Sequence, residues 1–174
     1  GPDLTAVKSA AATLIPHLAD GDVVVLESTT YPGTTEEVVA PILAESGLQV
    51  PSQVKLAFSP ERVDPGNATY GITNTPKVVG GLDEASSAAA RDFYSRFCDT
   101  VVVAKGAREA ELAKLLENTY RHVNIALINE LAILSHELDI DVWDAIRCAA
   151  TKPFGFQAFY PGPGVGGHCI PIDP

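Results

Sequence analysis

The stretch "DVVVLEST", residues 22–29, decides the fold that we expect for this chain. Its three consecutive valines and the leucine after them form a short apolar, β-branched run, which is typical of a strand buried on both faces. A turn at Pro32-Gly33 follows, and then a helical segment with Thr34 or Thr35 as its expected N-cap. The stretch therefore predicts a strand that leads through a turn into a helix.

The alternation of strands and helices continues on both sides of this stretch. A helix is expected over residues 4–18, and further runs predict three strands and one helix in "VKLAFSPER" (54–62), "KVVGG" (77–81), "DEASSAAARDFYSRFC" (83–98) and "TVVVA" (100–104). Strands that alternate with helices of about 12–16 residues indicate a doubly wound, parallel α/β sheet. Because only about four strands can be counted, the sequence predicts the C-terminal half of a Rossmann-like sheet.

A long helix is predicted from Ala107 onward. Residues 108–140 contain no glycine or proline, and their apolar residues recur at steps of three and four. A helix of this length spans about 45–50 Å, which suggests an element that joins domains or subunits. Asp141 is expected to cap a shorter helix over residues 142–151.

Composition and charge exclude several functional classes. The net charge of −10 argues against a nucleic-acid partner, because such binding depends on clustered lysines and arginines. No apolar run approaches the roughly 18–20 residues that span a bilayer, so no membrane partner is expected. Three cysteines far apart, Cys98, Cys148 and Cys169, fit a reducing cytoplasm better than a set of disulfides. The first two are expected to pack among helical apolar residues.

The stretch "GPGVGGHCIPIDP", residues 162–174, is the most unusual part of the sequence. Its glycines do not form a dinucleotide-binding fingerprint, because prolines flank them and no helix can begin there. They leave a backbone that can approach a ligand closely, and a turn-rich linker is the alternative. Cys169 could be a core cysteine, a metal ligand or a nucleophile. The adjacent His168 lacks the spacing of a zinc ligand pair, so no metal site is expected.

Five other residues could contribute chemistry. Lys114 and Asn118 are four apart on the long helix and share a face, where they could stabilise developing negative charge or simply contact solvent. Asp173 comes four residues after the last cysteine and could act as a base near it. Thr29 and Glu61 each follow a strand, at the carboxyl edge where doubly wound folds bind their ligands.

Taken together, these segments resemble the UDP-glucose/GDP-mannose dehydrogenase family. The segments that carry the resemblance follow the family order and cover nearly the whole chain: "ESTTYPGTT" (27–35), "FSPERVDPGN" (58–67), "KVVGG" (77–81), "ELAKLLENTYRHVNIALINELA" (111–132) and the terminal stretch. Within the family, "SPERVDPGN", "ATKPFGF" and "GGHCIPIDP" resemble the branch that oxidises UDP-N-acetylhexosamines, such as UDP-N-acetylglucosamine 6-dehydrogenases.

The resemblance implies an enzyme that oxidises C6 of a UDP-sugar twice with NAD, from alcohol to aldehyde to carboxylate. Cys169 matches the family's nucleophile, which holds the aldehyde as a thiohemiacetal and then the acid as a thioester that water cleaves. Lys114 and Asn118 match the residues that polarise the C6 oxygen and position water. Asp173 matches the carboxylate that assists hydrolysis.

The same resemblance implies binding residues at the strand ends and in the terminal loop. Thr29 and Glu61 match catalytic-site residues that border the substrate and the nicotinamide. The expected NAD contacts are Ser28, Thr29, Glu61 and Cys169. The expected UDP-sugar contacts are Glu61, Arg62, Lys114, Asn118, Tyr160, Gly164 and Gly166.

For the domains, the resemblance implies a partial NAD-binding, Rossmann-like domain over residues 1–105 and a small all-α central domain over residues 106–174. A homodimer through the long helix, residues 107–138, is the family expectation. The family's N-terminal G-x-G fingerprint and C-terminal uridine-binding domain are missing from the sequence, so these residues alone are expected to bind NAD and substrate poorly. Pro65 and Ile172 stand where UDP-glucose dehydrogenases often carry Glu and Lys, which argues against UDP-glucose.

Other interpretations stay open at this point. UDP-glucose or GDP-mannose are the alternative substrates. A non-catalytic dimerisation module would need only the long helix. A 3-hydroxyacid dehydrogenase would use a lysine and an asparagine on that helix, but it would need no cysteine.

Overall fold

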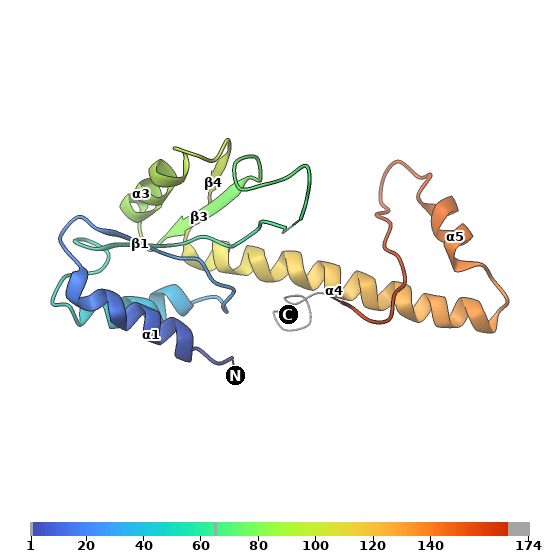
Figure 1. Ribbon diagram of the computed structural model, residues 1–174, viewed down its shortest axis with the longest axis horizontal. Coiled ribbons are helices and arrows are strands. Elements are labelled where there is room, and N and C mark those ends of the chain that lie inside the picture. The colour runs from blue at the N-terminus through green and yellow to red at the C-terminus, as the bar shows by residue number, and fades with distance from the viewer. Residues whose placement is uncertain (1, 65, 167–174) are drawn as a thin grey trace. The chain divides into compact units, whose positions relative to one another are not determined.

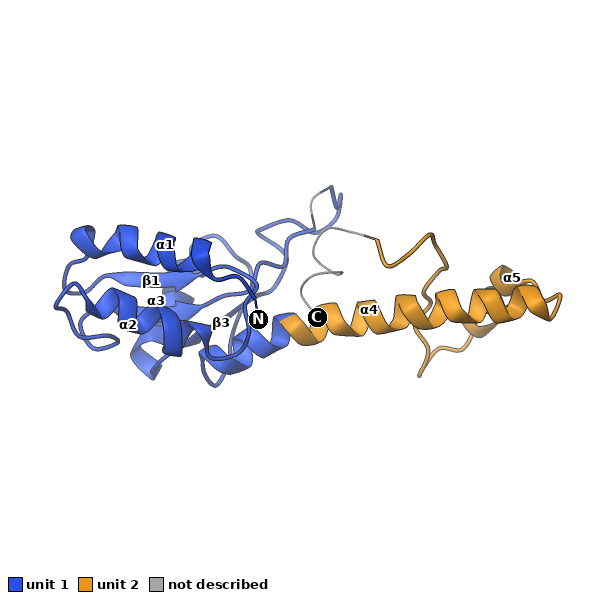
Figure 2. Ribbon diagram, turned by 90° about the horizontal axis from the view of Figure 1, so that it is seen from below, with its two compact units in different colours: residues 1–114 blue, residues 115–174 orange. Residues whose placement is uncertain are grey.

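A computed structural model of the protein describes residues 2–64 and 66–166. The chain divides into two compact units, residues 1–114 and 115–174 (Figure 2). The first unit contains the sheet and its covering helices, and the second contains most of the long helix and the segment that follows it (Figure 1). The cysteine and the aspartate of the terminal stretch, Cys169 and Asp173, lie outside the described residues.

The first unit alternates helices and strands as the sequence predicts. Its elements are α1 (Thr5–Leu14), a 3-10 turn (Ile15–His17), β1 (Val23–Leu26), a π-helical turn (Thr35–Val39) that continues into α2 (Ala40–Ala44), β2 (Lys55–Phe58), β3 (Lys77–Gly81), α3 (Glu84–Tyr94) and β4 (Val101–Val103). The long helix α4 (Ala107–Glu137) begins in this unit and continues into the second.

The four strands form one sheet in the order β1-β2-β3-β4. β1 pairs parallel with β2, with Val23 opposite Lys55, and β3 pairs parallel with β4. The expectation of an all-parallel sheet is wrong for the middle pair, because β2 and β3 run antiparallel, with Ala57 opposite Gly81. A parallel pair needs a crossover, usually a helix, whereas residues 59–76 form no helix among those described and return the chain in the opposite direction.

Helices cover both faces of the sheet. On one face, Leu43 of α2 and Leu56 of β2 share a buried cluster with residues of α1. On the other face, Ala57 of β2 packs with Tyr94 of α3, and Figure 1 shows α1 and α3 on opposite sides of β1. β1 is not buried on both faces as expected. Val23 is 42% exposed, because β1 forms the edge of the sheet within the described chain.

The start of α4 packs closely against the sheet. Ala107 and Ala110 share a buried cluster with Phe58 of β2. A Cβ atom at Gly80 of β3 would lie 2.1 Å from the carbonyl oxygen of Gly106, so a side chain cannot fit there without a backbone shift. The absence of a side chain at this position therefore lets β3 contact the residue before α4.

Two helix caps were predicted, and one of them is confirmed. Asp141 caps α5 (Val142–Ala149) by accepting hydrogen bonds from the backbone N–H of Trp143 at 2.9 Å and of Asp144 at 3.2 Å. The prediction that Thr34 or Thr35 supplies the cap of its helix is wrong. Thr34 instead donates its hydroxyl to the carbonyl of Tyr31 at 2.7 Å, and the cap comes from α4, as described below.

The second unit consists of the rest of α4, the short helix α5 and the segment to residue 166. The segment packs on the helices through aromatic rings: Tyr160 stacks on Trp143 with ring centroids 6.1 Å apart. Cys98 in the first unit is buried as expected, but Cys148 on α5 is exposed. No helix among the described residues is long and apolar enough to cross a membrane.

Candidate functional site

The carboxyl ends of β1 and β2 place several predicted site residues along one edge of the sheet. Ser28 and Thr29 follow β1 and are half-buried, and Glu61 and Arg62 follow β2. Because β1 and β2 are parallel, the loops that follow them leave the sheet at the same edge. These four residues therefore follow strand ends, as the sequence pattern predicts.

Lys114 of α4 reaches the loop that follows β2. Its Nζ donates a hydrogen bond to the backbone carbonyl of Glu61 at 2.7 Å. The carboxylate of Glu61 accepts from the backbone N–H of Val63 at 2.6 Å, and the Arg62 guanidinium donates to the carbonyl of Pro76 at 2.6 Å. The loop after β2 is therefore held by Lys114 of α4 and by the bond between Arg62 and Pro76. The predicted residues Lys114 and Glu61 lie in contact.

Asn118 follows Lys114 by one helical turn and is fully buried. Its side-chain oxygen accepts a short hydrogen bond from the guanidinium of Arg121. Lys114 and Asn118 therefore share the helix face expected from their spacing. Arg121 was not among the predicted residues, although its step of three from Asn118 is a signal for such a contact.

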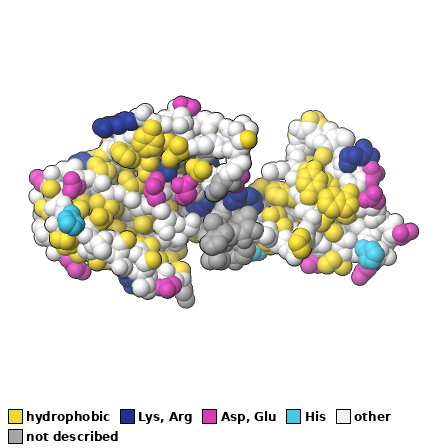
Figure 3. Space-filling model, in the orientation of Figure 1, with side chains coloured by type: hydrophobic (Ala, Val, Ile, Leu, Met, Phe, Trp, Pro, Cys, Tyr) yellow, Lys and Arg dark blue, Asp and Glu magenta, His cyan; other side chains and the backbone are white. Residues whose placement is uncertain are grey.

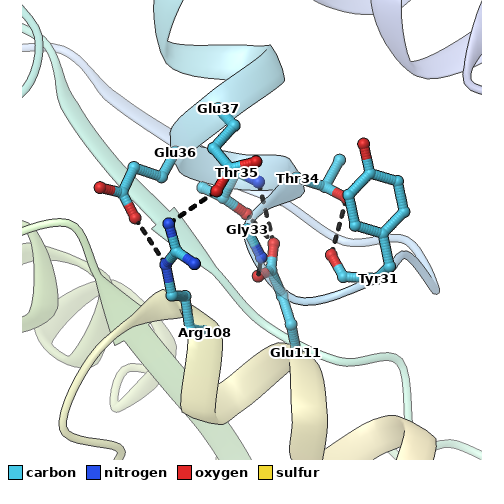
Figure 4. A network of polar contacts seen from close by, with 8 residues as sticks. All are labelled: Tyr31, Gly33, Thr34, Thr35, Glu36, Glu37, Arg108 and Glu111. Atoms are coloured by element: carbon cyan, nitrogen blue, oxygen red, sulfur yellow. Dashed lines mark hydrogen bonds and ion pairs between the residues drawn. The ribbon is translucent and has the colours of Figure 1, made fainter.

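Glu111 is the site residue that sequence reasoning missed most clearly. It is fully buried and lies three residues before Lys114 on α4. Its carboxylate accepts hydrogen bonds from the N–H of Gly33 at 2.6 Å, from the N–H of Thr35 at 2.9 Å and from the Thr35 hydroxyl at 2.7 Å (Figure 4). Glu111 thus caps the helical segment that begins at Thr35, where a carboxylate is favoured by the free N–H groups.

Gly33 adopts the backbone conformation that this contact requires. Its φ is +104°, a value that L residues rarely adopt, and a Cβ atom there would lie 3.0 Å from the Glu37 carboxylate. Beside it, Arg108 of α4 forms exposed ion pairs with Glu36 at 2.8 Å and with Glu37 at 2.7 Å (Figure 4). The first turn of α4 and the start of the helix after β1 are therefore joined by both buried and exposed contacts.

Glu27, at the end of β1, is the centre of a second polar cluster. It accepts hydrogen bonds from Lys77 Nζ and from the Tyr94 hydroxyl, each at 2.6 Å, and Lys77 also lies over the Tyr94 ring. Burial opposes the ionised form of Glu27, but the two donors outweigh it and hold the pKa of this carboxyl below its ordinary value. Burial and the bond to Glu27 raise the pKa of Tyr94, which stays neutral.

Thr30 completes the edge of the sheet with a buried hydroxyl. Its Oγ1 has no hydrogen-bond partner among the described residues, and the residue is 6% exposed. A cavity of about 460 Å³ lies beside this segment and is lined by residues of α1 and β1 together with Ser28. Ser28 lines this cavity, whereas Thr30 is not among its lining residues.

The predicted residues of the terminal loop lie in the second unit. Tyr160 is 60% exposed and stacks on Trp143. Gly164 and Gly166 both have positive φ values, 152° and 69°. The loop is attached to α4 by a 2.9 Å hydrogen bond from the N–H of Gly162 to the side chain of Asn129.

Two domain descriptions of one family match this chain. Residues 1–98 match the NAD binding domain of the UDP-glucose/GDP-mannose dehydrogenase family, and residues 108–174 match its central domain. The chain belongs to the UDP-glucose/GDP-mannose dehydrogenase family. NAD is therefore its cofactor, as expected from the sequence.

Among the relatives of this family member are UDP-N-acetyl-D-mannosamine dehydrogenases. That of Methanococcus aeolicus is 43% identical over 99% of this chain and 38% of its own length. That of Escherichia coli K12 is 42% identical over 99% of this chain and 43% of its own length. The UDP-N-acetylhexosamine branch is thus confirmed, and the chain spans about two fifths of the length of the curated relatives it matches.

Solved structures agree with this assignment. A UDP-N-acetylmannosamine dehydrogenase from Pyrococcus horikoshii superposes with a TM-score of 0.93 at 38% identity, over 99% of this chain and 41% of that one. A UDP-glucose dehydrogenase from Pyrobaculum islandicum has a TM-score of 0.75 at 29% identity, over 85% of this chain and 34% of that one. A 3-hydroxyisobutyrate dehydrogenase from Mycobacterium tuberculosis, 16% identical with a TM-score of 0.66 over 85% of this chain and 47% of that one, shares the fold alone.

Proposed function

We propose that the complete enzyme to which this chain belongs oxidises C6 of a UDP-N-acetylhexosamine to the carboxylate in two steps, with UDP-N-acetyl-D-mannosamine as its substrate. The observation that carries the proposal is the position of Lys114, whose ammonium contacts the loop after β2 at the carboxyl edge of the sheet. The two curated relatives and the Pyrococcus horikoshii structure support the choice of sugar, because all three carry the mannosamine name. UDP-N-acetylglucosamine, which the sequence motifs suggested, becomes the competing substrate.

In this proposal, Lys114 and Asn118 act on the oxygen at C6. The ammonium of Lys114 donates to that oxygen as negative charge develops on it, and the Asn118 amide positions the oxygen or a water. The contact between Lys114 and the Glu61 carbonyl supports this role, since it fixes a flexible side chain before the sugar binds. Glu61 and Arg62 border the sugar on the side of β2.

Cys169 and Asp173 carry the second half of the reaction in this proposal. The thiolate adds to C6 of the aldehyde, so that a carbon–sulfur bond forms and the former carbonyl oxygen takes up a proton. After a hydride leaves C6 and this hydroxyl loses its proton, the sulfur holds the acyl group as a thioester. Water assisted by Asp173 then cleaves the thioester, which releases the acid and restores the thiol.

NAD, when bound, accepts the hydride from C6 in each oxidation. Ser28, Thr29 and Glu61 are the residues at the sheet edge that we propose to hold it, together with Cys169. The same edge of a doubly wound sheet is where such folds bind nucleotides.

We extend the proposal to domains, assembly and compartment. Residues 1–105 would form a partial NAD-binding domain, and residues 106–174 a central domain that dimerises through residues 107–138. Six exposed apolar residues are spaced along one face of α4 and the turn that follows it, which supports such an interface: Leu116, Val123, Leu127, Leu131, Leu134 and Leu138. The acidic charge and the scattered cysteines support a cytoplasmic enzyme.

The test is the stoichiometry of the complete enzyme with limiting UDP-N-acetyl-D-mannosamine. We expect two NADH per sugar, and a lower kcat/KM with UDP-N-acetylglucosamine and with UDP-glucose. The variant Cys169→Ser should keep the fold and form no acid, because no thioester can be made and cleaved. One NADH per sugar, or acid formation at the wild-type rate by Cys169→Ser, would contradict the mechanism. Turnover that requires Cys169 would also exclude both a non-catalytic dimerisation module and a 3-hydroxyacid dehydrogenase.

A further inference from the structure

The buried carboxylate of Glu111 joins α4 to a segment that is far away in sequence. Its three hydrogen bonds run to Gly33 and Thr35, which precede it by 78 and 76 residues. One turn later on the same helix, Lys114 contacts the carbonyl of Glu61 at 2.7 Å. A single turn of α4 therefore connects the loop after β1 with the loop after β2.

The charge of Glu111 is compensated by backbone and hydroxyl donors. Within residues 2–64 and 66–166, no lysine or arginine pairs with this carboxylate, although it is fully buried. A buried charge is tolerated only when hydrogen bonds satisfy it, so the three donors hold the carboxylate in one position. The side chain of Glu111 is thereby a rigid connection, in contrast to the exposed ion pairs of Arg108.

The loop after β1 connects Gly33, which Glu111 holds, to the predicted site residue Thr29. Residues 31–34 form a tight turn, in which the carbonyl of Tyr31 accepts from both the N–H and the hydroxyl of Thr34, at 3.1 and 2.7 Å. The turn holds Gly33 close to Tyr31, and only Thr30 separates Tyr31 from Thr29, so we expect a displacement of Gly33 to reach Thr29. Glu111 and Lys114 are three residues apart, about 4.5 Å along the helix axis and on one face.

We propose that Glu111 is a positioning residue that fixes Lys114 relative to the loop of Thr29 and thereby sets the geometry of the oxidised carbon. Glu111 does not touch the substrate in this assignment and acts through its neighbours. The inference rests on the proposed function, since it assumes that Lys114 and Thr29 flank the sugar. Misplacement of a reacting group by about 1 Å can cost about 100-fold in rate, so a supporting residue of this kind affects turnover strongly.

The variant Glu111→Gln disturbs the hydrogen bond to Gly33 and keeps those to Thr35. Its amide oxygen can continue to accept from Thr35, but its amide nitrogen faces the N–H of Gly33, donor against donor. In the complete enzyme we expect kcat for NADH formation to fall about 10- to 100-fold, with a change in the sugar KM of less than about threefold. Amide hydrogen exchange at Gly33 should accelerate.

The matched control is Glu109→Gln, which removes the same charge from an exposed side chain in the first turn of α4. Its kcat should stay within about twofold of wild type.

A double-mutant cycle distinguishes positioning from a general loss of structure. In a Lys114→Ala background, measured in single turnovers with excess enzyme, Glu111→Gln should change the rate by less than about threefold, because the group that it positions is gone. Should Glu111→Gln fail to fold, Thr35→Val keeps the volume and the backbone N–H and removes only the hydroxyl donor. We expect Thr35→Val to lower kcat about 3- to 10-fold in the same cycle.

The outcomes distinguish a failure of the proposed function from a failure of the role proposed for Glu111. Absence of turnover by the wild-type enzyme with any UDP-sugar overturns the proposed function, and the inference with it. Wild-type turnover with an equally active Glu111→Gln overturns the inference alone. Equal rate losses in the wild-type and Lys114→Ala backgrounds also overturn it, because they show a structural role without action through Lys114.

Discussion

At the scale of single residues, two carboxylates beside the sheet, the buried Glu111 and the partly exposed Glu27, are held in different ways. Glu111 is satisfied by N–H and hydroxyl donors, whereas Glu27 is paired with the cation of Lys77. Lys77 itself is 8% exposed, so the pair fixes the end of β1 to the start of β3. The charge state of Glu27 should therefore be visible in the pH dependence of stability.

We predict that Glu27→Gln lowers the stability at pH 7 and that this loss disappears in acid. The folded pKa of Glu27 is lowered, so its contribution is complete above the unfolded value of about 4.3 and is lost as the pH falls through the folded value. The effect at pH 7 should be about 1 kcal/mol or less, because the side chain is 42% exposed and solvent screens the pair. Urea unfolding at pH 7 and pH 3 measures this loss of stability.

Glu45→Gln, at an exposed position, is the control. A stability difference between wild type and Glu27→Gln that persists unchanged at pH 3 would contradict the role assigned to the charge of Glu27.

At the scale of secondary-structure elements, the contact between β3 and the start of α4 depends on Gly80. We predict that Gly80→Ala lowers the free energy of unfolding by about 1–3 kcal/mol, because the new methyl group would overlap the backbone of Gly106. Thermal or urea unfolding measures the change. Gly71→Ala is the matched control: its Cβ atom would meet nothing within 4 Å, so its effect should stay below about 1 kcal/mol. Equal stabilities of the two variants would show that the backbone can shift freely there.

The element pattern shows what the sequence can and cannot predict. Local signals were sufficient for the long helix, for the Asp141 cap and for the strand β3, because periodicity and capping chemistry act within a few residues. The antiparallel step from β2 to β3 was missed because strand direction depends on the path of a long loop. The cap from Glu111 was missed because it joins residues more than seventy positions apart, which no local pattern reports.

For the candidate site too, the sequence was sufficient for some residues and not for others. Lys114 and Glu61 were predicted separately, from the helix face and from a strand end, and the structure shows a contact between them. Their roles in binding and catalysis remain predictions. The roles of Cys169 and Asp173 remain predictions, since both residues lie outside those that the structure describes. Gly33, with its positive φ, is a position where the turn signal in the sequence was read correctly, although its hydrogen-bond partner could not be.

At the scale of the whole molecule, hydrophobic side chains remain on the surface of both units (Figure 3). From Leu116 to Leu138 they follow one face of α4 and of the turn after it, at steps of three, four and seven residues. Lys114 and Asn118 lie on the opposite face, because they are about half a turn out of phase with the leucines. An exposed apolar row of this length is typical of a surface that another protein covers.

We predict that the complete enzyme is a dimer and that Leu127→Glu combined with Leu131→Glu converts it to monomers. Both side chains are exposed, at 54% and 41%, so the charges should leave the fold of the unit intact while opposing association. Light scattering with size-exclusion chromatography measures the mass. Ile133→Glu is the control, since this residue is 59% exposed but lies outside the row. A dimer that survives the double variant would place the interface elsewhere.

The two faces of α4 restrict how the length of this helix can change in evolution. Each inserted or deleted residue between Lys114 and Leu127 would rotate one face by about 100° relative to the other. Single insertions would therefore turn the leucine row away from its partner or Lys114 away from Glu61. A change of seven residues, nearly two full turns, would restore the relative orientation to within about 20°. Homologous chains should accordingly vary in the length of their loops and keep the length of this segment of α4.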